Sequence, residues 1–270
     1  MRRHVALLLL AAVAAGPPET AAPQTAAPVV DVEGARFRIA LADGRVLAQN
    51  ELTGVRIAFG DGSGRRRIVR IDGVTPDAKD PSGEIALYSL SEQDPVSGEW
   101  RNLCLPDPDG RRLGFPLSGR FALDGRYEPQ PKLLLITCTG GAEGKCVRFG
   151  YKPWGRAPDG TPLLPYYQAC VRLVRADYAG DGRGTTKNGQ PIDIYDSLGI
   201  EAPANDPAYE FEAGFGPDGA VCVRHVRVKE NATLAGVEES SPRLKGRVGE
   251  TCDEALARQA GALVFVRSPP

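Results

Sequence analysis

The chain has 270 residues, with 33 basic residues, 34 acidic residues and a hydrophobic content of 42%. That length is enough to bury a sizeable core, in one large domain or two small ones. The formal net charge of −1 leaves no electrostatic case for a nucleic-acid partner or for an anionic membrane surface.

The first residues form the pattern of a signal peptide. Arg2 and Arg3 precede an apolar run from Val5 to Ala12, and small residues follow at 13–15. The run is too short for a membrane span, which needs about 20 residues. We expect a signal peptide over 1–15 and a Pro/Ala-rich linker over 16–30, with no membrane span after cleavage. The predicted location is extracytoplasmic, either periplasmic or secreted, and without Arg2 and Arg3 the net charge becomes −3 (31 basic against 34 acidic residues).

All six cysteines lie beyond the predicted signal peptide, and an even number in an exported chain predicts three disulfides. A metal site is disfavoured because the chain has no C-x-x-C pair, and its only histidine beyond the signal segment is His225. Six cysteines permit fifteen pairings, among which sequence does not decide. We favour pairing between neighbours along the chain, which gives Cys104–Cys138, Cys146–Cys170 and Cys222–Cys252.

The segment 31–137 has the pattern of antiparallel β-structure. The stretches "RFRIAL", "GVRIAF" and "RIVRI" alternate apolar with polar residues, as half-buried strands do. Asp-Gly pairs, which favour tight turns, recur at 43–44, 61–62, 72–73, 109–110 and 124–125. The continuous apolar run at 133–137 predicts a central strand that is covered on both faces, and the segment ending at Trp100 predicts a hairpin.

The segment 138–270 mixes helices and strands. A helix is predicted from Pro165, with Arg172 and Arg175 off its apolar face and its stop at Gly180 and Gly182. A hairpin around 217–219, a helix over 252–260 and a last strand over 262–266 follow, whereas the glycines leave 140–151 open between helix and strand. The fold class is therefore α+β: a β-rich antiparallel N-terminal half and a mixed helix/strand C-terminal half, stapled by disulfides.

Four carboxylates near the predicted helix end are the candidate polar or cation site. They are Asp177, Asp181, Asp193 and Asp196. Carboxylates with intervening glycines suit a hard cation such as Ca²⁺. However, an EF-type loop starting at Asp177 has Ala179 at its third position and Asn188 at its twelfth, so the template fails. We favour a structural role, in which Asp177 pairs with an arginine of its own helix and the others form turns or local pairs.

No catalytic residue is predicted. There is no phosphate loop and no G-x-S-x-G motif, and His225 lies in a strand pattern without an identifiable serine partner. Asp193 and Asp196 could serve glycoside hydrolysis only at a separation that sequence does not define. We therefore predict neither a metal nor another cofactor.

Several ordered blocks resemble one family. The blocks are "CTGGAEGKCVRFGYKPW" (138–154), "ACVRLVRADYAGDG" (169–182), "TKNGQPIDIYDSLGI" (186–200) and "GAVCVRHVR" (219–227). Together they resemble the ADYC-domain family of bacterial, typically exported proteins of uncharacterised function, which implies such a domain over 31–270. Ala176, Asp177 and Tyr178 match the Ala-Asp-Tyr-Cys motif, whereas Ala179 stands at the cysteine position. The resemblance further implies a lost disulfide partner at Ser241, so that Ala179 and Ser241 lie close together.

The functional expectation is a non-catalytic binding or structural module of the cell envelope or secretome, with its partner unidentified. The alternative is a hydrolase that uses the carboxylates within 177–196 on an extracytoplasmic polymer. In a hydrolase those carboxylates should converge in a cleft. Carboxylates that are scattered, or paired with arginines, favour the binding module.

Overall fold

The computed structural model describes residues 27–60, 64–204 and 206–270. The predicted signal peptide, most of the predicted linker and the Asp-Gly pair at 61–62 lie outside these residues. The first strand begins at Val29, within the last residues of the expected linker. Within the described ranges, no helix combines the length and the apolar character that a membrane span requires.

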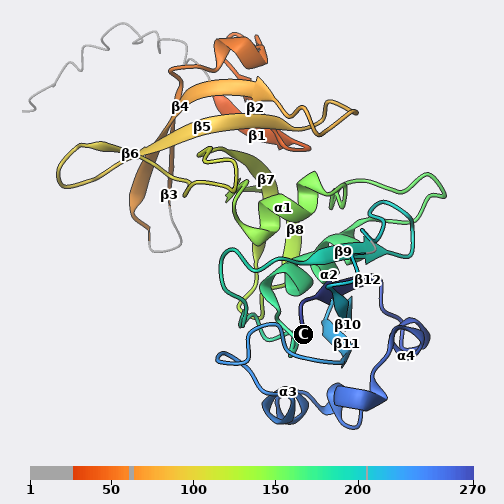
Figure 1. The fold of residues 1–270 in the computed structure, drawn as a ribbon. Helices are drawn as coiled ribbons and strands as arrows, with labels where there is room; N and C mark the ends of the chain where they lie inside the picture. The colour runs from red at the N-terminus through yellow and green to blue at the C-terminus, as the bar shows by residue number, and fades with distance from the viewer. Residues whose placement is uncertain (1–26, 61–63, 205) are drawn as a thin grey trace, which may run out of the picture.

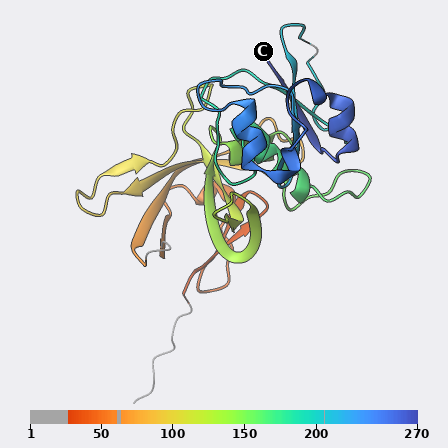
Figure 2. The same ribbon diagram turned by 90° about the horizontal axis from the view of Figure 1, so that it is seen from below.

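The first half of the chain forms two antiparallel sheets (Figures 1 and 2). A hairpin of β1 and β2 is followed by a six-stranded sheet with the order β3-β4-β5-β7-β8, in which β6 pairs with β5. A short 3-10 helix, Gln49–Glu51, precedes this sheet. The strands are β1 (Val29–Glu33), β2 (Arg36–Ala40), β3 (Arg56–Gly60), β4 (Arg66–Pro76), β5 (Ala86–Gln93), β6 (Trp100–Asn102), β7 (Gly114–Phe121) and β8 (Tyr127–Cys138).

The alternating stretches of the sequence form β2, β3 and β4, as predicted. Their alternate apolar residues face inward, because successive side chains of a strand point to opposite faces. Phe37, Ile57 and Ile71 are buried in this way and join one core cluster. The predicted hairpin ending near Trp100 is also confirmed, as β5 and β6.

Two predictions about the first half are wrong. The run 133–137 lies in β8, which is the edge strand of its sheet, and Leu133 is 40% exposed. Continuous apolar character indicated burial on both faces, but strand order is set by distant pairing rather than by composition. Asp72 and Gly73 lie inside β4, at a register shift between Ile71 and Gly73 where β4 pairs with β5. The Asp-Gly pair there forms a β-bulge instead of a turn.

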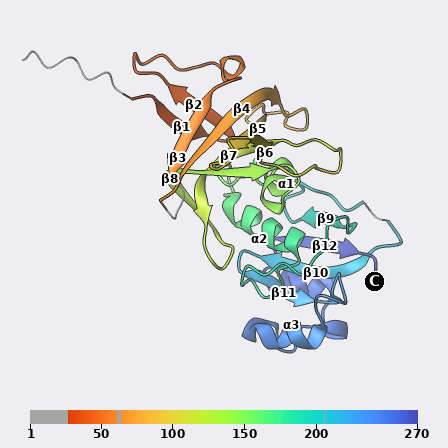
Figure 3. The ribbon, with the colours of Figure 1, turned by 90° about the vertical axis from the view of Figure 1, so that its left-hand side faces the viewer.

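The second half of the chain places helices around a four-stranded antiparallel sheet with the order β11-β10-β12-β9. Helices α1 and α2 lie between this sheet and the sheets of the first half, and α3 lies on the far side (Figure 3). Two 3-10 turns, Pro242–Leu244 and Gly249–Thr251, join α3 to α4. The elements are α1 (Ala142–Arg148), α2 (Leu164–Arg175), β9 (Asp193–Asp196), β10 (Glu210–Gly216), β11 (Gly219–Val223), α3 (Leu234–Ser240), α4 (Glu254–Gln259) and β12 (Val264–Ser268).

Helix α2 is the central helix of this half. Pro165 occupies its first turn, where a missing backbone N–H costs nothing. The helix ends earlier than the glycines predicted, because Ala176 adopts the left-handed conformation with φ 50° and ψ 44°. Arg172 was expected on the polar side but is buried, since the side of α2 that lacks apolar residues is also covered by neighbouring segments.

Three disulfides staple the fold, and their pairing is the predicted one between sequence neighbours. Cys146–Cys170 joins α1 to α2, whereas the other two, Cys104–Cys138 and Cys222–Cys252, tie loop segments to β8 and β11. Every cysteine in the described residues is paired. Such a disulfide set is typical of proteins that fold in an oxidising compartment outside the cytoplasm. The α+β, disulfide-stapled fold class is therefore confirmed.

Candidate functional site

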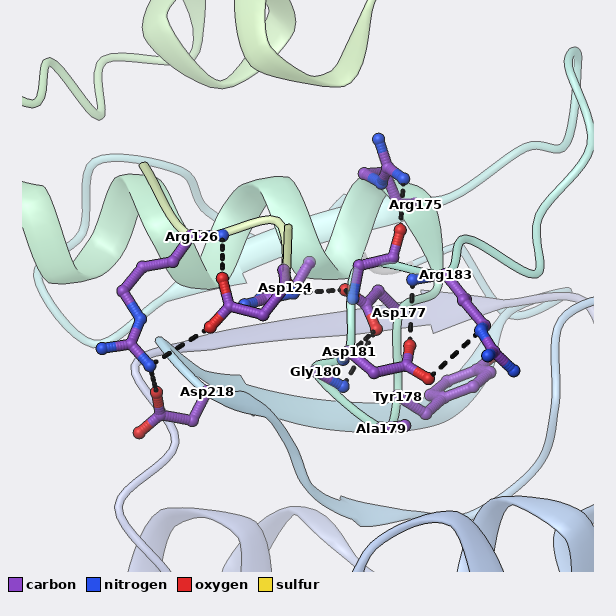
Figure 4. A network of polar contacts seen from close by, with 12 residues as sticks. Asp124, Arg126, Arg175, Asp177, Tyr178, Ala179, Gly180, Asp181, Arg183 and Asp218 are labelled. Atoms are coloured by element: carbon purple, nitrogen blue, oxygen red, sulfur yellow. Dashed lines mark hydrogen bonds and ion pairs between the residues drawn. The ribbon is translucent and has the colours of Figure 1, made fainter. Parts of the chain in front are cut away.

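The corner after α2 is organised by the buried carboxylate of Asp177 (Figure 4). Its two oxygens accept hydrogen bonds from the backbone N–H groups of Gly180 (2.9 Å), Asp181 (3.2 Å) and Gly182 (3.0 Å). A carboxylate that accepts several backbone N–H groups holds the loop around itself. Asp177 therefore faces its own loop, with little capacity left for a ligand.

Arg172 neutralises Asp177 at a distance of 2.5 Å between Nη1 and Oδ2, and the two side chains are 2% and 1% exposed. The same guanidinium donates to the carbonyl of Asp124, in the turn between β7 and β8, and to that of Pro217 (3.3 Å), in the turn between β10 and β11. One buried cation thus ties α2 to both halves of the chain. The predicted pairing of Asp177 with a helix arginine is confirmed, although Asp177 itself lies two residues beyond the end of α2.

Asp181 lies in the same corner but points to the surface (Figure 4). Its side chain is 46% exposed and stands 3.6 Å from the guanidinium of Arg183. Its carboxylate also accepts the N–H of Arg183 at 2.9 Å, which is an ordinary Asx turn. The two aspartates of the corner therefore have different surroundings and no common ligand position.

Asp193 and Asp196 lie in β9 and organise the loop that follows it. Asp196 accepts the N–H groups of Leu198 (2.6 Å) and Glu201 (2.7 Å), and the hydroxyl of Tyr151 donates to it at 2.8 Å. Asp193 accepts one backbone N–H, that of Ala204, at 3.0 Å. Both carboxylates are buried. Like Asp177, they satisfy backbone donors, which is a structural role.

Glu201 was not singled out in the sequence, but it combines a raised pKa with a position in a hollow. It lies directly after the "TKNGQPIDIYDSLGI" block and is partly buried. Burial raises the pKa of Glu201, and the neighbouring carboxylates of Asp196 and Asp193 raise that pKa further. No described residue forms an ion pair or side-chain hydrogen bond with it. The only sequence signal was its position five residues beyond Asp196, which nothing distinguished from other loop acids.

Glu201 lines a hollow with a volume of about 830 Å³. The hollow lies between the two halves. One wall comes from Lys79 and residues 107–109 of the first half, and the floor comes from the start of α1 and the end of α2. The loop 186–190 and Ile192, which lead into β9, form the other wall. A concave, partly apolar space of this size is adequate for a small organic ligand. We refer to it below as the seam hollow.

Most charges around the seam hollow are already neutralised by protein partners. Arg148 pairs with Asp77 at 2.5 Å, and Arg227 pairs with the fully buried Glu212 at 3.0 Å. By contrast, Lys145, on α1, is a partly buried residue, and its ammonium group has no partner among residues 27–60, 64–204 and 206–270.

Lys79 likewise has no ion-pair partner in the described ranges, and it lies on the exposed rim. The charges left to interact with a ligand are thus two ammonium groups, Lys79 and Lys145, and the carboxyl group of Glu201. This balance favours an anionic ligand, the more so when Glu201 is protonated.

Several kinds of reactive centre find no support in the described residues. These residues contain no group of three or more His, Cys, Asp or Glu side chains that could hold a metal ion. Their cysteines are all in disulfides, so none is a thiolate nucleophile. The ring nitrogens of His225 are buried without a hydrogen-bond partner in this part of the chain, so no serine or carboxylate activates it.

The segments that contain Ala179 and Ser241 meet. Arg243, two residues after Ser241, donates to the carbonyl oxygens of Ala179 (2.6 Å) and Tyr178 (3.2 Å). Ser241 is 5% exposed. These contacts bring the two segments together, whereas the closeness of the two side chains stays a prediction.

Comparison with known proteins identifies one match. The sequence model of the ADYC domain matches residues 49–229, which is more than half of the chain. The matched range contains the four blocks that carry the resemblance. Neither a curated protein nor a solved structure matches the chain.

Replacing Asp177 with Asn is expected to lower the free energy of unfolding by about 3 kcal/mol, because the buried guanidinium of Arg172 loses its counter-charge. Urea unfolding at neutral pH measures the loss. The matched control is Asp181→Asn, in the same loop but with an exposed side chain. This substitution should change the free energy of unfolding by less than about 0.5 kcal/mol. Equal effects of the two substitutions would contradict the assigned difference between them.

Replacing Glu201 with Gln is expected to raise the free energy of unfolding at neutral pH. Because the folded state has the higher pKa, wild-type stability falls as the pH rises from 4.5 through the folded-state pKa. Gln carries no such proton, so the gain should shrink below pH 4.5. Urea unfolding across this pH range tests the prediction, with the exposed Glu239→Gln as control. A gain that is independent of pH would refute it.

The double variant Ala179→Cys/Ser241→Cys is expected to form a fourth disulfide. The physical reason is that Arg243 already holds the two segments together, so closing the bridge requires little backbone movement. Thiol titration of the oxidised, denatured protein should detect no free cysteine, against one in each single variant. Two free thiols in the double variant would show that the side chains are too far apart.

Proposed function

Because the chain belongs to the ADYC-domain family, we propose that it is an exported, non-catalytic binding module whose ligand occupies the seam hollow. The observation that carries the proposal is convergence. All four sequence blocks that identify the family contribute to the lining of this one hollow, including Lys145 of the first block, Arg175 of the second, Lys187 of the third and Arg227 of the fourth. Blocks that lie far apart in the sequence meet at a concave surface, which is how a binding site is built.

The chemistry of the hollow supports a small organic anion as ligand. We assign Lys145 as the anchor, because this partly buried residue has no counter-ion in the described residues and its ammonium group can pair with a carboxylate. Phe149, Val174 and Ile192 supply apolar walls beside it. A carboxylate-bearing sugar fits this combination, since sugar rings present both an apolar face and hydroxyl groups.

Export is supported by two independent features. The charged and apolar start of the chain has the pattern of a signal peptide with small residues at the cleavage position. The three disulfides require an oxidising compartment to form. Periplasmic or secreted binding modules meet both conditions.

A second candidate function is a carboxylate-dependent hydrolase centred on Glu201. The observation that favours it is the raised pKa of Glu201 in a hollow, beside the carboxylates of Asp193 and Asp196, because a protonated acid next to carboxylates is the usual pattern of general-acid catalysis. This candidate ranks second because Asp193 and Asp196 are both used by backbone N–H groups. Release of reducing ends from cell-wall polysaccharide that is abolished by Glu201→Gln would establish it instead.

The binding proposal is tested by thermal melts with pairs of related sugars, of which one member carries a carboxylate and the other is neutral. Galacturonate is compared with galactose, in which a hydroxymethyl group replaces the carboxylate, and N-acetylmuramic acid is compared with N-acetylglucosamine, which lacks the lactyl group. At about 100 times Kd a ligand adds about 2.7 kcal/mol to stability, so the acidic member of a pair should raise Tm by several degrees and the neutral member should not.

The variant Lys145→Glu should remove that Tm shift, whereas the exposed Lys245→Glu should keep it. Both variants change the net charge equally, so the comparison isolates the position of the charge. A shift that persists in Lys145→Glu, or equal shifts from acidic and neutral sugars, would contradict the assigned anchor.

A further inference from the structure

A second charged surface lies at the far end of the six-stranded sheet, where Trp100 is covered by arginines. The guanidinium of Arg70 stands 4.4 Å from the Trp100 ring centroid, and that of Arg56 stands 5.3 Å from it. Arg56 and Arg70 are direct cross-strand partners of β3 and β4. They therefore project from the same face of the sheet, onto which the indole of β6 reaches across β5.

This arrangement preorganises the guanidinium groups. An arginine held flat on an indole by a cation–π contact has lost much of its rotamer freedom before any ligand arrives. The N–H groups of Arg56, which is exposed, remain available to the two oxygens of a carboxylate. Arg70 is additionally held by Asp72 at 2.5 Å. Arg56 has no ion pair within the described segments and is exposed.

A third arginine extends the surface. Arg66 starts β4, is exposed, has no counter-ion in the described residues, and by alternation along β4 projects from the same face as Arg70. Arg67, which pairs with Glu92, and Arg101, the cross-strand partner of Glu92, project from the opposite face. The β5–β6 hairpin that carries Trp100 projects away from the helices of the second half (Figures 1 and 2). This surface is thus separate from the seam hollow, which is built by α1, α2 and the loop before β9.

The local charge differs in sign from that of the chain. On the face that Trp100 shares with Arg56, Arg66 and Arg70, the described strand residues of β3 to β6 carry these three arginines against one acid, Asp72, a net of +2. The chain as a whole is net negative. Such an asymmetry directs an acidic partner to one end of the molecule.

We propose that this arginine-rich face, formed by Arg56, Arg66 and Arg70 around Trp100, binds an acidic polysaccharide through its carboxylates. A polymer of uronic acids repeats carboxylates along a chain, and several guanidiniums on one sheet face engage several of them together. An extended polymer can bind along an open sheet face without a deep cavity. This face would therefore be a second binding site, independent of the seam hollow.

A nucleic acid fits the same face less well. Single-stranded nucleic acids need open aromatic rings on which bases stack, whereas the single indole here is covered by two guanidiniums. Duplex DNA has a much higher charge density and requires a strongly basic footprint, which a net of +2 does not provide.

The test uses the purified protein and immobilised polygalacturonate, with neutral dextran and duplex DNA as comparison matrices. The triple variant Arg56→Gln/Arg66→Gln/Arg70→Gln is expected to bind polygalacturonate at least about tenfold more weakly at about 0.1 M salt. The slope of log affinity against log salt should also fall by roughly two to three, since each lost charge contact releases fewer counter-ions. Wild type should not bind dextran.

The matched control is Arg45→Gln/Arg120→Gln/Arg126→Gln, which removes three exposed arginines of the same half that lie elsewhere. This control should change the affinity for polygalacturonate by less than about twofold, because affinity depends on the arginines that contact the polymer and not on the net charge of the protein. If the triple variant does not melt cooperatively, the double variant Arg56→Gln/Arg66→Gln, which leaves the Arg70–Asp72 pair intact, decides the matter with an expected loss of about threefold or more.

Equal losses in the control and the triple variant, or unchanged binding in both arginine variants, would overturn the proposal. Tighter binding to DNA than to polygalacturonate would overturn it in favour of a nucleic-acid partner. The loss caused by the triple substitution should persist in a Lys145→Glu background, because the seam hollow does not contribute to that loss. The failure of this inference and the failure of the seam-hollow proposal are therefore distinguishable.

Discussion

The fold depends on the charge of one buried guanidinium, that of Arg172. A cation at 2% exposure is tolerated only with a counter-charge and hydrogen-bond acceptors, and removing one partner leaves an uncompensated charge that costs several kcal/mol. Asp177 supplies the charge, and the carbonyls of Asp124 and Pro217 supply the acceptors. These groups come from α2, its following corner, the β7–β8 turn and the β10–β11 turn. The two halves of the chain therefore meet at Arg172, because each half provides a carbonyl acceptor for its guanidinium.

The same principle builds the wall of the seam hollow. Arg227 donates to both oxygens of Glu212 and to the carbonyls of Leu173 and Val174 at the end of α2. Tyr178 donates to Glu212 and accepts the N–H of Arg227. A buried pair with all its hydrogen-bonding groups satisfied is rigid. Lys145, which lines the same hollow, has no such partner among the described residues. We locate the candidate site by this contrast between paired and unpaired charges.

The two proposed surfaces suit different ligands. The seam hollow suits a single small anion, because few free charges line an enclosed space. The arginine-rich face suits a repeating polyanion, because several guanidiniums share one open sheet face. Two of the three disulfides support these surfaces: Cys146–Cys170 joins α1 to α2, and Cys104–Cys138 fixes the segment after β6 to β8. A molecule with both surfaces would hold an acidic polymer at one end and read a smaller acidic group in the seam between its halves.

The sequence by itself determined what depends on short-range pattern. Alternation specified β2, β3 and β4, apolar spacing after Pro165 specified α2, and the even number of cysteines indicated three disulfides. The sequence also indicated that Asp177 pairs with an arginine of the preceding helix. Only the tertiary structure decided that β8 is an edge strand, that Arg172 is buried, and that Glu201 and Lys145 face one hollow. The physical reason is that strand order, burial of a charge and the lining of a cavity arise from contacts between segments far apart along the chain, which no local periodicity encodes.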